Sequence, residues 1–143
     1  MKIASLLASN TEIAYALGLE NHIVGVSHEC DYPHQVNQKP VLTRSKIDPS
    51  KSSREIDQQV KTLLKSALSV YEVDETKLRE LKPDVILTQD QCEVCAVSLK
   101  DVEEAVNKFI CQAKIVSLKP ETFDDILKTI EIIGYETKKE KEA

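Results

Sequence analysis

The chain has 143 residues, of which 41% are hydrophobic and 30% charged, and its formal net charge is −5. This length and composition predict one globular domain and exclude a disordered chain. The acidic balance, the absence of Trp and the low aromatic content of 4% argue against a nucleic-acid-binding protein. No apolar run reaches the roughly 18 residues of a membrane span. The three glycines are spaced too widely for a dinucleotide-binding or P-loop motif.

The N-terminal residues predict a strand followed by a helix. Residues 2–7 form an apolar run that is too short for the core of a signal peptide and is typical of a buried strand. Ser9 and Glu12 fit a capping box, which predicts a helix that starts at Ser9 and ends at Gly18. As written, the chain is expected to be cytoplasmic, or extracytoplasmic if a leader was removed.

The rest of the chain alternates strand and helix patterns. Further strands are expected at residues 22–27, 40–43, 84–88 and 113–118. Further amphipathic helices are expected at residues 53–71, 74–81, 98–110 and 121–133, the last with one apolar stripe of Phe123, Ile126, Leu127, Ile130 and Ile133. This order predicts an α/β fold: a single three-layer α/β/α lobe over residues 1–134, with a mostly parallel sheet of about four or five strands. The charged residues 135–143 form a tail.

Three polar segments follow predicted strands: residues 8–12, 28–34 and 89–97. In open parallel sheets, ligands bind beyond the carboxyl ends of the strands. The sequence therefore predicts a binding site at this edge of the sheet.

Two of these segments have both a chemical and a purely structural interpretation. Ser9 and Asn10 could bind an anionic group at a helix start, but a simple helix cap is the preferred interpretation. In residues 28–34, His28 and Cys30 could bind a soft metal, Asp31 could accept hydrogen bonds and Tyr32 could stack on a flat ligand. A rigid polar loop explains the same segment equally well.

The cysteines leave three interpretations open. Cys92 and Cys95 form a CxxC motif before a helix, which suits a redox pair poorly because Glu93 would oppose a thiolate. A zinc site would need Cys30 together with His28 or His34. A disulfide between Cys30 and one of these two cysteines, or a set of buried free thiols, is the third interpretation. Cys111 is expected to be a core thiol. No nucleophile–base pair or paired catalytic carboxylates are visible, so an enzyme is not expected.

Four segments resemble a known family. Residues 6–19 resemble the opening of the substrate-binding proteins of iron–siderophore, heme and cobalamin ABC transporters. The cysteine-containing segments 27–33 and 88–98, together with residues 39–48, look like the cobalamin-binding subgroup. The likeness extends over residues 2–134.

The resemblance implies a non-enzymatic ligand-binding lobe for cobalamin or an iron chelate. Proteins of this family have two α/β lobes joined by a long helix, and this chain matches the N-terminal lobe, with residues 135–143 as a candidate start of the inter-lobe helix. A transporter permease is the implied partner. A missing second lobe or a homodimer mate would complete the ligand site.

By the same resemblance, the ligand-contacting residues are Ser9, Asn10, His28, Asp31, Tyr32, Gln89 and Asp90. The candidate metal site or disulfide comprises His28, Cys30, Cys92 and Cys95. Two alternatives stay open: an intracellular zinc or thiol module that uses Cys30, Cys92 and Cys95, and a truncated lobe without independent activity.

Overall fold

A computed structural model describes residues 1–65, 70–90, 98–109 and 113–143. The strands are β1 (Ile3–Ser5), β2 (Ile23–Val26), β3 (Thr43–Ser45), β4 (Tyr71–Val73), β5 (Val85–Gln89) and β6 (Lys114–Leu118). The helices are α1 (Ala8–Ala16), the 3₁₀ helix η1 (His34–Gln38), α2 (Ser53–Lys65), α3 (Glu75–Leu81), α4 (Leu99–Phe109) and α5 (Phe123–Thr137). The predicted alternation of strands and helices is confirmed, although η1 lies within a segment expected to be a loop.

Four strands form one parallel sheet in the order β2-β1-β5-β6. From β1 the chain moves outward to β2, and from β5 it moves outward in the opposite direction to β6. The strand order therefore reverses between β1 and β5, which is where open α/β sheets form a crevice at their carboxyl edge. The predicted parallel sheet is confirmed with four strands.

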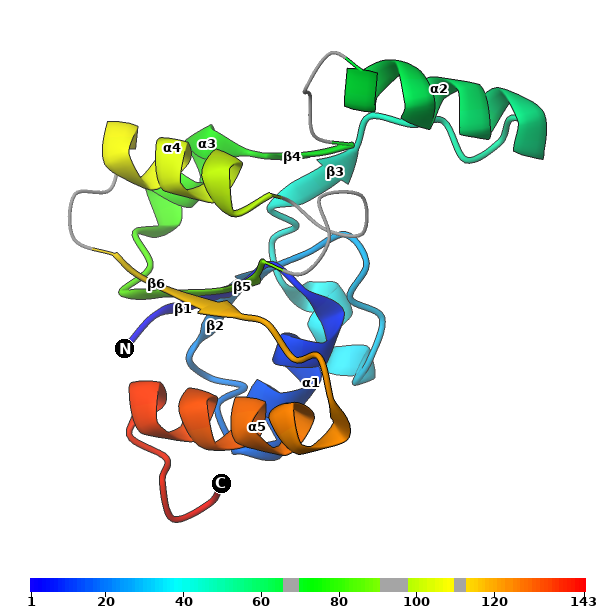
Figure 1. The fold of residues 1–143 in the computed structure, drawn as a ribbon. Helices are drawn as coiled ribbons and strands as arrows, with labels where there is room; N and C mark the ends of the chain where they lie inside the picture. The colour runs from blue at the N-terminus through cyan, green and yellow to red at the C-terminus, as the bar shows by residue number, and fades with distance from the viewer. Residues whose placement is uncertain (66–69, 91–97, 110–112) are drawn as a thin grey trace.

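Helices cover both faces of this sheet, with α1 and α5 on one side and α3 and α4 on the other (Figure 1). Successive strand residues point to opposite faces. Ile3, Val85 and Leu87 belong to the buried cluster that includes α1 and α5 residues, whereas Ala4 and Ile86 belong to the cluster that includes α3 and α4 residues. The central strands β1 and β5 are therefore buried on both faces, as expected for apolar strands of a parallel sheet, whereas the edge strand β6 exposes Lys114 and Ser117.

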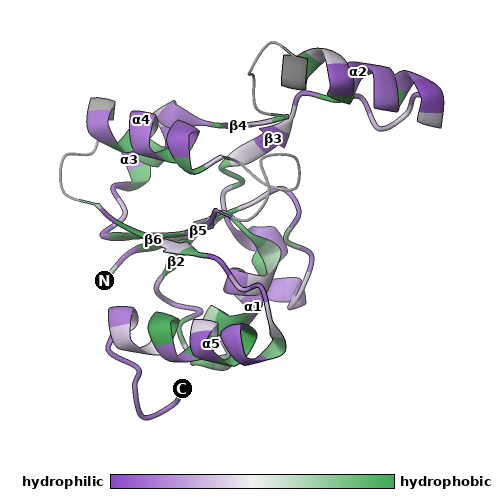
Figure 2. Cartoon of the chain, viewed as in Figure 1, coloured by the Kyte–Doolittle hydropathy of each residue, from purple (hydrophilic) through white to green (hydrophobic). Residues whose placement is uncertain are grey.

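Strands β3 and β4 form a separate antiparallel ladder, from which α2 extends away from the rest of the molecule (Figure 1). We call residues 43–65 and 70–73 the arm. Arg44 and Glu72 face each other in the ladder and form an ion pair. Figure 2 shows that α2 is largely hydrophilic, in contrast to the strands of the main sheet.

Two predicted boundaries in this region are wrong. The helix expected over residues 53–71 ends by Lys65 among the described residues, and Tyr71 lies in β4, because its backbone pairs with Ser45. The strand expected at residues 40–43 is displaced: Val41 forms an isolated parallel bridge with Val26, and the regular strand β3 starts at Thr43. Apolar periodicity continued across both boundaries and did not reveal them.

The predicted capping box at Ser9 is also wrong. Helix α1 begins at Ala8, its N-cap is Leu7, and no side chain caps it. Ser9 is therefore an exposed residue of the first turn. Two other helices do have side-chain caps at the first residue of their predicted ranges: Asp74 accepts a hydrogen bond from the backbone N–H of Lys77, and Ser98 accepts one from that of Asp101. Gly18 ends the α1 region with a φ of 71°, a conformation that glycine adopts easily.

The expected apolar stripe of α5 does not face the sheet as one unit. Phe123 is 72% exposed, and Ile126 and Leu127 are each 48% exposed, whereas Ile133 is fully buried. The buried residues of α5 are Thr129, Ile133, Gly134 and Thr137. The small and hydroxyl-bearing residues therefore pack inward, so a prediction from hydrophobicity alone places the buried face incorrectly. The helix also runs to Thr137, four positions beyond the predicted Ile133.

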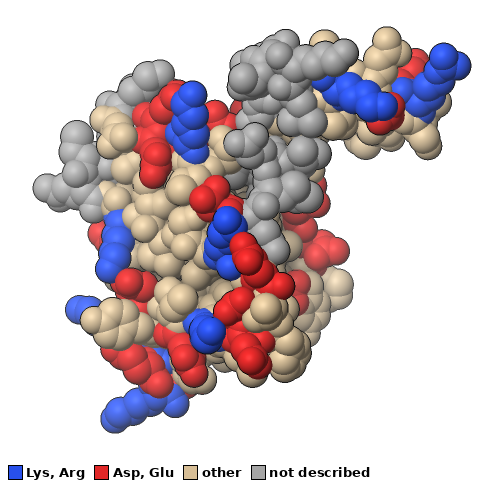
Figure 3. Space-filling model, viewed as in Figure 1, with Lys and Arg blue, Asp and Glu red and all other residues tan. Residues whose placement is uncertain are grey.

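Acidic and basic side chains are interspersed on the surface face in Figure 3. Many exposed charges form local pairs, such as Lys128 with Asp125 and Lys61 with Asp57. Among the described residues, no helix has the length and apolar character that crossing a membrane requires.

Candidate functional site

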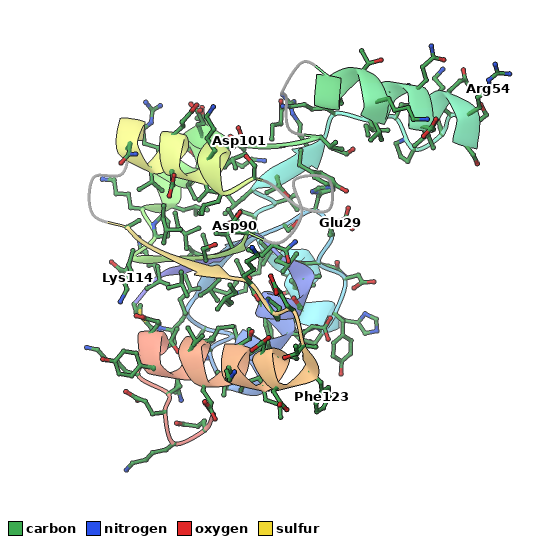
Figure 4. The ribbon with its side chains drawn as sticks, viewed as in Figure 1. Glu29, Arg54, Asp90, Asp101, Lys114 and Phe123 are labelled. Atoms are coloured by element: carbon green, nitrogen blue, oxygen red, sulfur yellow. The ribbon has the colours of Figure 1, made fainter. Side chains whose placement is uncertain are left out.

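Buried polar side chains gather at the carboxyl edge of the sheet. Ser5 ends β1, Ser27 directly follows β2, and Thr88 and Gln89 end β5. All four are at most 9% exposed. Figure 4 shows Glu29 and Asp90 toward this end of the sheet, opposite Lys114, which begins β6. Because buried polar groups require hydrogen-bond partners, this edge has a defined internal network.

Asn10 joins α1 to β5 across the point where the strand order reverses. Its side chain is 1% exposed. The Asn10 Nδ2 group donates to the backbone oxygen of Thr88 at 3.3 Å. Asn10 therefore holds the first turns of α1 against the carboxyl end of β5, which fixes the shape of the crevice at the switch point.

A second set of contacts lies beneath α1. Thr11 Oγ1 lies 2.8 Å from Ser5 Oγ and 3.2 Å from Cys30 Sγ. Thr11 and Ser5 are both fully buried. These contacts tie the segment after β2 to the end of β1, so that the three strand ends and α1 form one connected unit.

Cys30 is a free thiol among the described residues. Burial raises the pKa of this thiol above its ordinary value, and the hydrogen bond with Thr11 partly offsets that effect. The protonated thiol is therefore favoured at neutral pH, which makes Cys30 a weak metal ligand and a weak nucleophile.

His28 belongs to a third group of contacts, centred on Thr43. Thr43 Oγ1 lies 2.7 Å from His28 Nδ1 and 3.1 Å from Ser27 Oγ. It also accepts a hydrogen bond from the backbone N–H of His28 at 3.0 Å. Thr43 is 5% exposed, so the base of the arm buries a single hydroxyl against the end of β2.

Two further side chains surround the His28 ring. The Tyr71 ring is tilted by 47° to it, with the two centroids 5.2 Å apart. On the other nitrogen, His28 Nε2 lies 3.3 Å from Glu29 Oε1. The Nε2 atom is buried and has no hydrogen-bond partner in the described part of the chain. The imidazole is therefore fixed through Nδ1 and by Tyr71, while Nε2 has no fixed partner.

The structure brings only some of the predicted site residues together. His28, Cys30, Asn10 and Gln89 lie in or beside the network at the carboxyl edge, whereas Ser9, Asp31, Tyr32 and Asp90 are exposed. Tyr32 lines a hollow of ≈ 550 Å³ between α1 and the start of η1. Cys92, Cys95 and Cys111 lie outside the described residues, so their proposed zinc, disulfide or core roles stay predictions.

Sequence reasoning missed the hydroxyl-bearing residues that organise this edge. Thr43 and Ser5 carry no motif, and Thr11 lies in the polar segment 8–12 but is not among the predicted site residues. The available signal was the end of each apolar run, since Ser5 and Ser27 interrupt hydrophobic strands. Thr43 could not be found in this way, because its position depends on the pairing of Val41 with Val26.

Within the described residues, no group of three or more His, Cys, Asp or Glu side chains could hold a metal ion. His28 and Glu29 provide two donor atoms 3.3 Å apart. Zinc in a structural site takes four protein ligands. This pair alone is therefore not a structural zinc site.

No protein-family model matches the chain. An uncharacterized ABC transporter substrate-binding lipoprotein of Bacillus subtilis, YvrC, is 28% identical over 99% of this chain and 36% of its own length. A periplasmic solute-binding protein of Staphylococcus epidermidis, described as a possible iron-binding protein, is 27% identical with a TM-score of 0.64, covering 99% of this chain and 43% of that one. The chain is related to ABC-transporter substrate-binding proteins.

Two more distant structures share the fold. A periplasmic heme-binding protein of Pseudomonas aeruginosa has a TM-score of 0.68 at 13% identity, over 99% of this chain and 39% of that one. The vitamin B12-binding protein BtuF of Vibrio cholerae has a TM-score of 0.61 at 23% identity, over 94% and 40%. The chain thus spans about two fifths of the length of these proteins. Proteins described as iron-, heme- and vitamin B12-binding all match, so the comparisons do not distinguish the cobalamin-binding subgroup.

These similarities do not support the expected cytoplasmic location. The B. subtilis relative is a lipoprotein, and the structural neighbours are periplasmic proteins.

Proposed function

We propose that this chain is a non-enzymatic, ligand-binding lobe of an ABC-transport substrate-binding protein, and that it forms one wall of a site for a metal chelate. The ligand class is an iron chelate, heme or a corrinoid such as cobalamin. One observation carries the proposal: the buried polar network lies at the carboxyl edge of β1, β2 and β5, where the strand order reverses, in a fold related to solute-binding proteins. The proposed location is extracytoplasmic.

The ligand would contact this edge through side chains from each of the three strand ends. We infer that Asn10 shapes the crevice, since its amide is fixed by Thr88. His28 and Gln89 are the proposed polar contacts, and the exposed Asp31, Tyr32, Asp90 and Ser9 belong to the rim. This assignment follows from burial: His28 is partly buried and Gln89 is buried at the sheet edge, and exposed rim groups contribute less to affinity.

A single wall leaves one side of a bound chelate in water. High affinity would need a second wall, because ligand sites of this size bury most of the ligand surface. A second lobe or a second copy of this chain would supply it, and a transporter permease is the proposed partner that receives the ligand.

The zinc or thiol module receives no support from Cys30. Burial raises the pKa of its thiol, which opposes the thiolate that metal binding and disulfide exchange need.

The test is an absorbance titration of the chain with hemin, aquocobalamin and ferrichrome in parallel. We expect saturable binding of one of them at micromolar concentration. His28→Ala should weaken that binding about tenfold, the effect of losing one directed contact. The matched control is Arg54→Ala at the far end of α2, which should bind as the unaltered chain does (Figure 4). A folded chain that binds none of the three probes would contradict the proposal.

A further inference from the structure

The Thr43 hydroxyl has three polar neighbours but only one proton and two lone pairs. The backbone N–H of His28 can only donate, so it occupies one lone pair of Thr43 Oγ1. The two remaining neighbours are His28 Nδ1 at 2.7 Å and Ser27 Oγ at 3.1 Å. Of these two contacts, Thr43 must accept one and donate the other for every group to be satisfied.

Ser27 decides the direction. This residue is 4% exposed, and its oxygen accepts a hydrogen bond from the backbone N–H of Glu29 at 3.3 Å. Among the described residues, Thr43 Oγ1 is the acceptor within reach of the Ser27 proton. If Ser27 donates to Thr43, then Thr43 donates to His28 Nδ1 and every proton of the relay has an acceptor. The opposite direction leaves two buried groups unpaired among the described residues, the Ser27 proton and the Nε2 lone pair, whereas the first direction leaves only Nε2–H, which lies 3.3 Å from the Glu29 carboxylate.

We propose that Thr43 is the positioning residue that holds His28 as the Nε2–H tautomer, so that His28 meets its ligand as a hydrogen-bond donor and not as a metal ligand. A histidine that binds a metal through Nε2 donates from its other nitrogen to a neighbouring acceptor. Here the relay makes Nδ1 the acceptor. The ligand group that fits His28 is therefore an oxygen acceptor, a carboxylate or amide oxygen at the rim of the chelate.

The surroundings of Nε2 agree with this role. The atom is buried, has no hydrogen-bond partner in the described part of the chain and lies 3.3 Å from Glu29 Oε1. The Glu29 side chain is 53% exposed, so it can turn into solvent and leave the Nε2–H group to a ligand oxygen. This inference rests on the proposed function for the ligand class, but the direction of the relay can be measured without any ligand.

The first arm of the test measures ¹⁵N chemical shifts of the imidazole rings in the ligand-free chain above pH 8. The chain has three histidines, and His28→Gln identifies the relevant signals by their loss. We expect protonated Nε2 and an accepting Nδ1 in the unaltered chain and in Thr43→Ser. In Thr43→Val, the ring should show the tautomer mixture of the exposed His34. A protonated Nδ1 in the unaltered chain would overturn the inference.

The second arm compares hemin with metal-free protoporphyrin IX, which carry the same carboxylates. If His28 is a donor, His28→Ala weakens both by the same factor, about tenfold for one charge-assisted hydrogen bond. His28→Gln should restore most of the loss, because its amide N–H can replace Nε2–H. A loss confined to hemin, with a changed Soret band, would overturn the inference in favour of axial ligation.

The two arms separate the inference from the proposed function. If neither porphyrin binds while the ring is the Nε2–H tautomer, porphyrins are excluded from the ligand class and the relay is supported. If both porphyrins bind while Nδ1 carries the proton, the proposed function is supported and the relay is wrong.

Discussion

The main sheet and the arm are built in opposite ways. The central strands β1 and β5 of the sheet are buried on both faces, and Ile3, Ile86 and Leu87 are fully buried. The arm combines a short antiparallel ladder with α2, and its residues of described burial are exposed or partly buried, apart from Thr43 at its base and Val70 before β4. Within the part of the chain that the structure describes, the arm contacts the candidate site at its base, through Thr43 and Tyr71 against His28. We therefore expect stability to depend mainly on the sheet, and the site geometry to depend on the sheet edge together with the base of the arm.

The largest expected effect comes from truncating the centre of the sheet. Ile86→Ala removes a fully buried side chain that packs with Leu78 and Val102. Such changes cost about 2–5 kcal/mol of unfolding free energy. The matched variant Val60→Ala in α2 should cost less than about 1 kcal/mol, because Val60 is only partly buried. Urea unfolding measures both, and equal losses would contradict the division between sheet and arm.

Gly25→Ala should have the next largest effect. An added Cβ would lie 2.8 Å from Leu42 Cγ and 3.1 Å from Leu81 Cδ1, both in a packed region. Overpacking of this kind costs about 1–3 kcal/mol. Gly18→Ala separates a clash from backbone strain, since φ at Gly18 is 71°, whereas the nearest atom to an added Cβ among the described residues outside its chain neighbours is Lys139 Nζ at 3.9 Å. We expect the Gly18 variant to lose roughly 1–2 kcal/mol. An unaltered melting temperature for Gly25→Ala would show that Leu42 can move aside.

A smaller effect is expected on the outer face of α5. Leu127 is 48% exposed and Ile133 is fully buried on the same helix. Leu127→Lys should change the unfolding free energy by no more than about 0.5 kcal/mol, whereas Ile133→Ala should cost about 2–5 kcal/mol. Chemical denaturation of the two variants tests which face packs on the sheet. A loss at Leu127 equal to that at Ile133 would mean that the apolar stripe faces inward after all.

The smallest effects concern the helix caps. The sheet-covering helix α5 and the arm helix α2 begin with the same kind of side-chain cap. Thr122 donates to Asp125 and Ser52 donates to Glu55, each at the start of its helix. These hydrogen bonds lower the pKa of Asp125 to about 2 and lower that of Glu55 below its ordinary value. Because the folded-state pKa of Asp125 is lowered, its stabilising contribution is present above the ordinary value of 3.8 and is lost as the pH falls toward about 2.

Substituting the hydroxyl residues of the two caps tests whether they lower the carboxylate pKa values in the same way. Thr122→Ala should raise the pKa of Asp125, and Ser52→Ala should raise that of Glu55, because each carboxylate loses its hydroxyl donor. Thr122→Ser should keep the low value. NMR titration of the carboxyl carbons measures all three, and an Asp125 pKa that does not change in Thr122→Ala would assign the shift to Lys128 instead.

Much of the fold could be predicted because strands and helices have different apolar periods. The apolar runs of β2, β5 and β6 interrupt the helical patterns clearly, and caps such as Asp74 and Ser98 depend only on residues close by in the sequence. Tyr71 shows where this reasoning fails: it continues a helical pattern, yet pairs with Ser45, and such non-local pairing leaves no trace in periodicity.

The sequence predicted that the candidate site lies at the carboxyl edge of the sheet, but it predicted few of the side-chain contacts there. His28 stands out by its residue type. Thr43 was missed because it reaches His28 only through pairing between segments far apart in the sequence. Asn10 was predicted as a site residue because it is polar and lies at a helix start. Its buried hydrogen bond to Thr88 could not be predicted, because it requires that β1 and β5 pair side by side in the sheet.

The most direct measurement maps the ligand site by backbone amide NMR during titration with hemin, aquocobalamin and ferrichrome. The account predicts that amide signals of Asn10, His28 and Asp90 shift saturably with one of these probes. The signals of Arg54 and its neighbours in α2 should stay in place. Shifts confined to α2, or none at all with any of the three probes in a folded chain, would contradict a binding site at the carboxyl edge of the sheet.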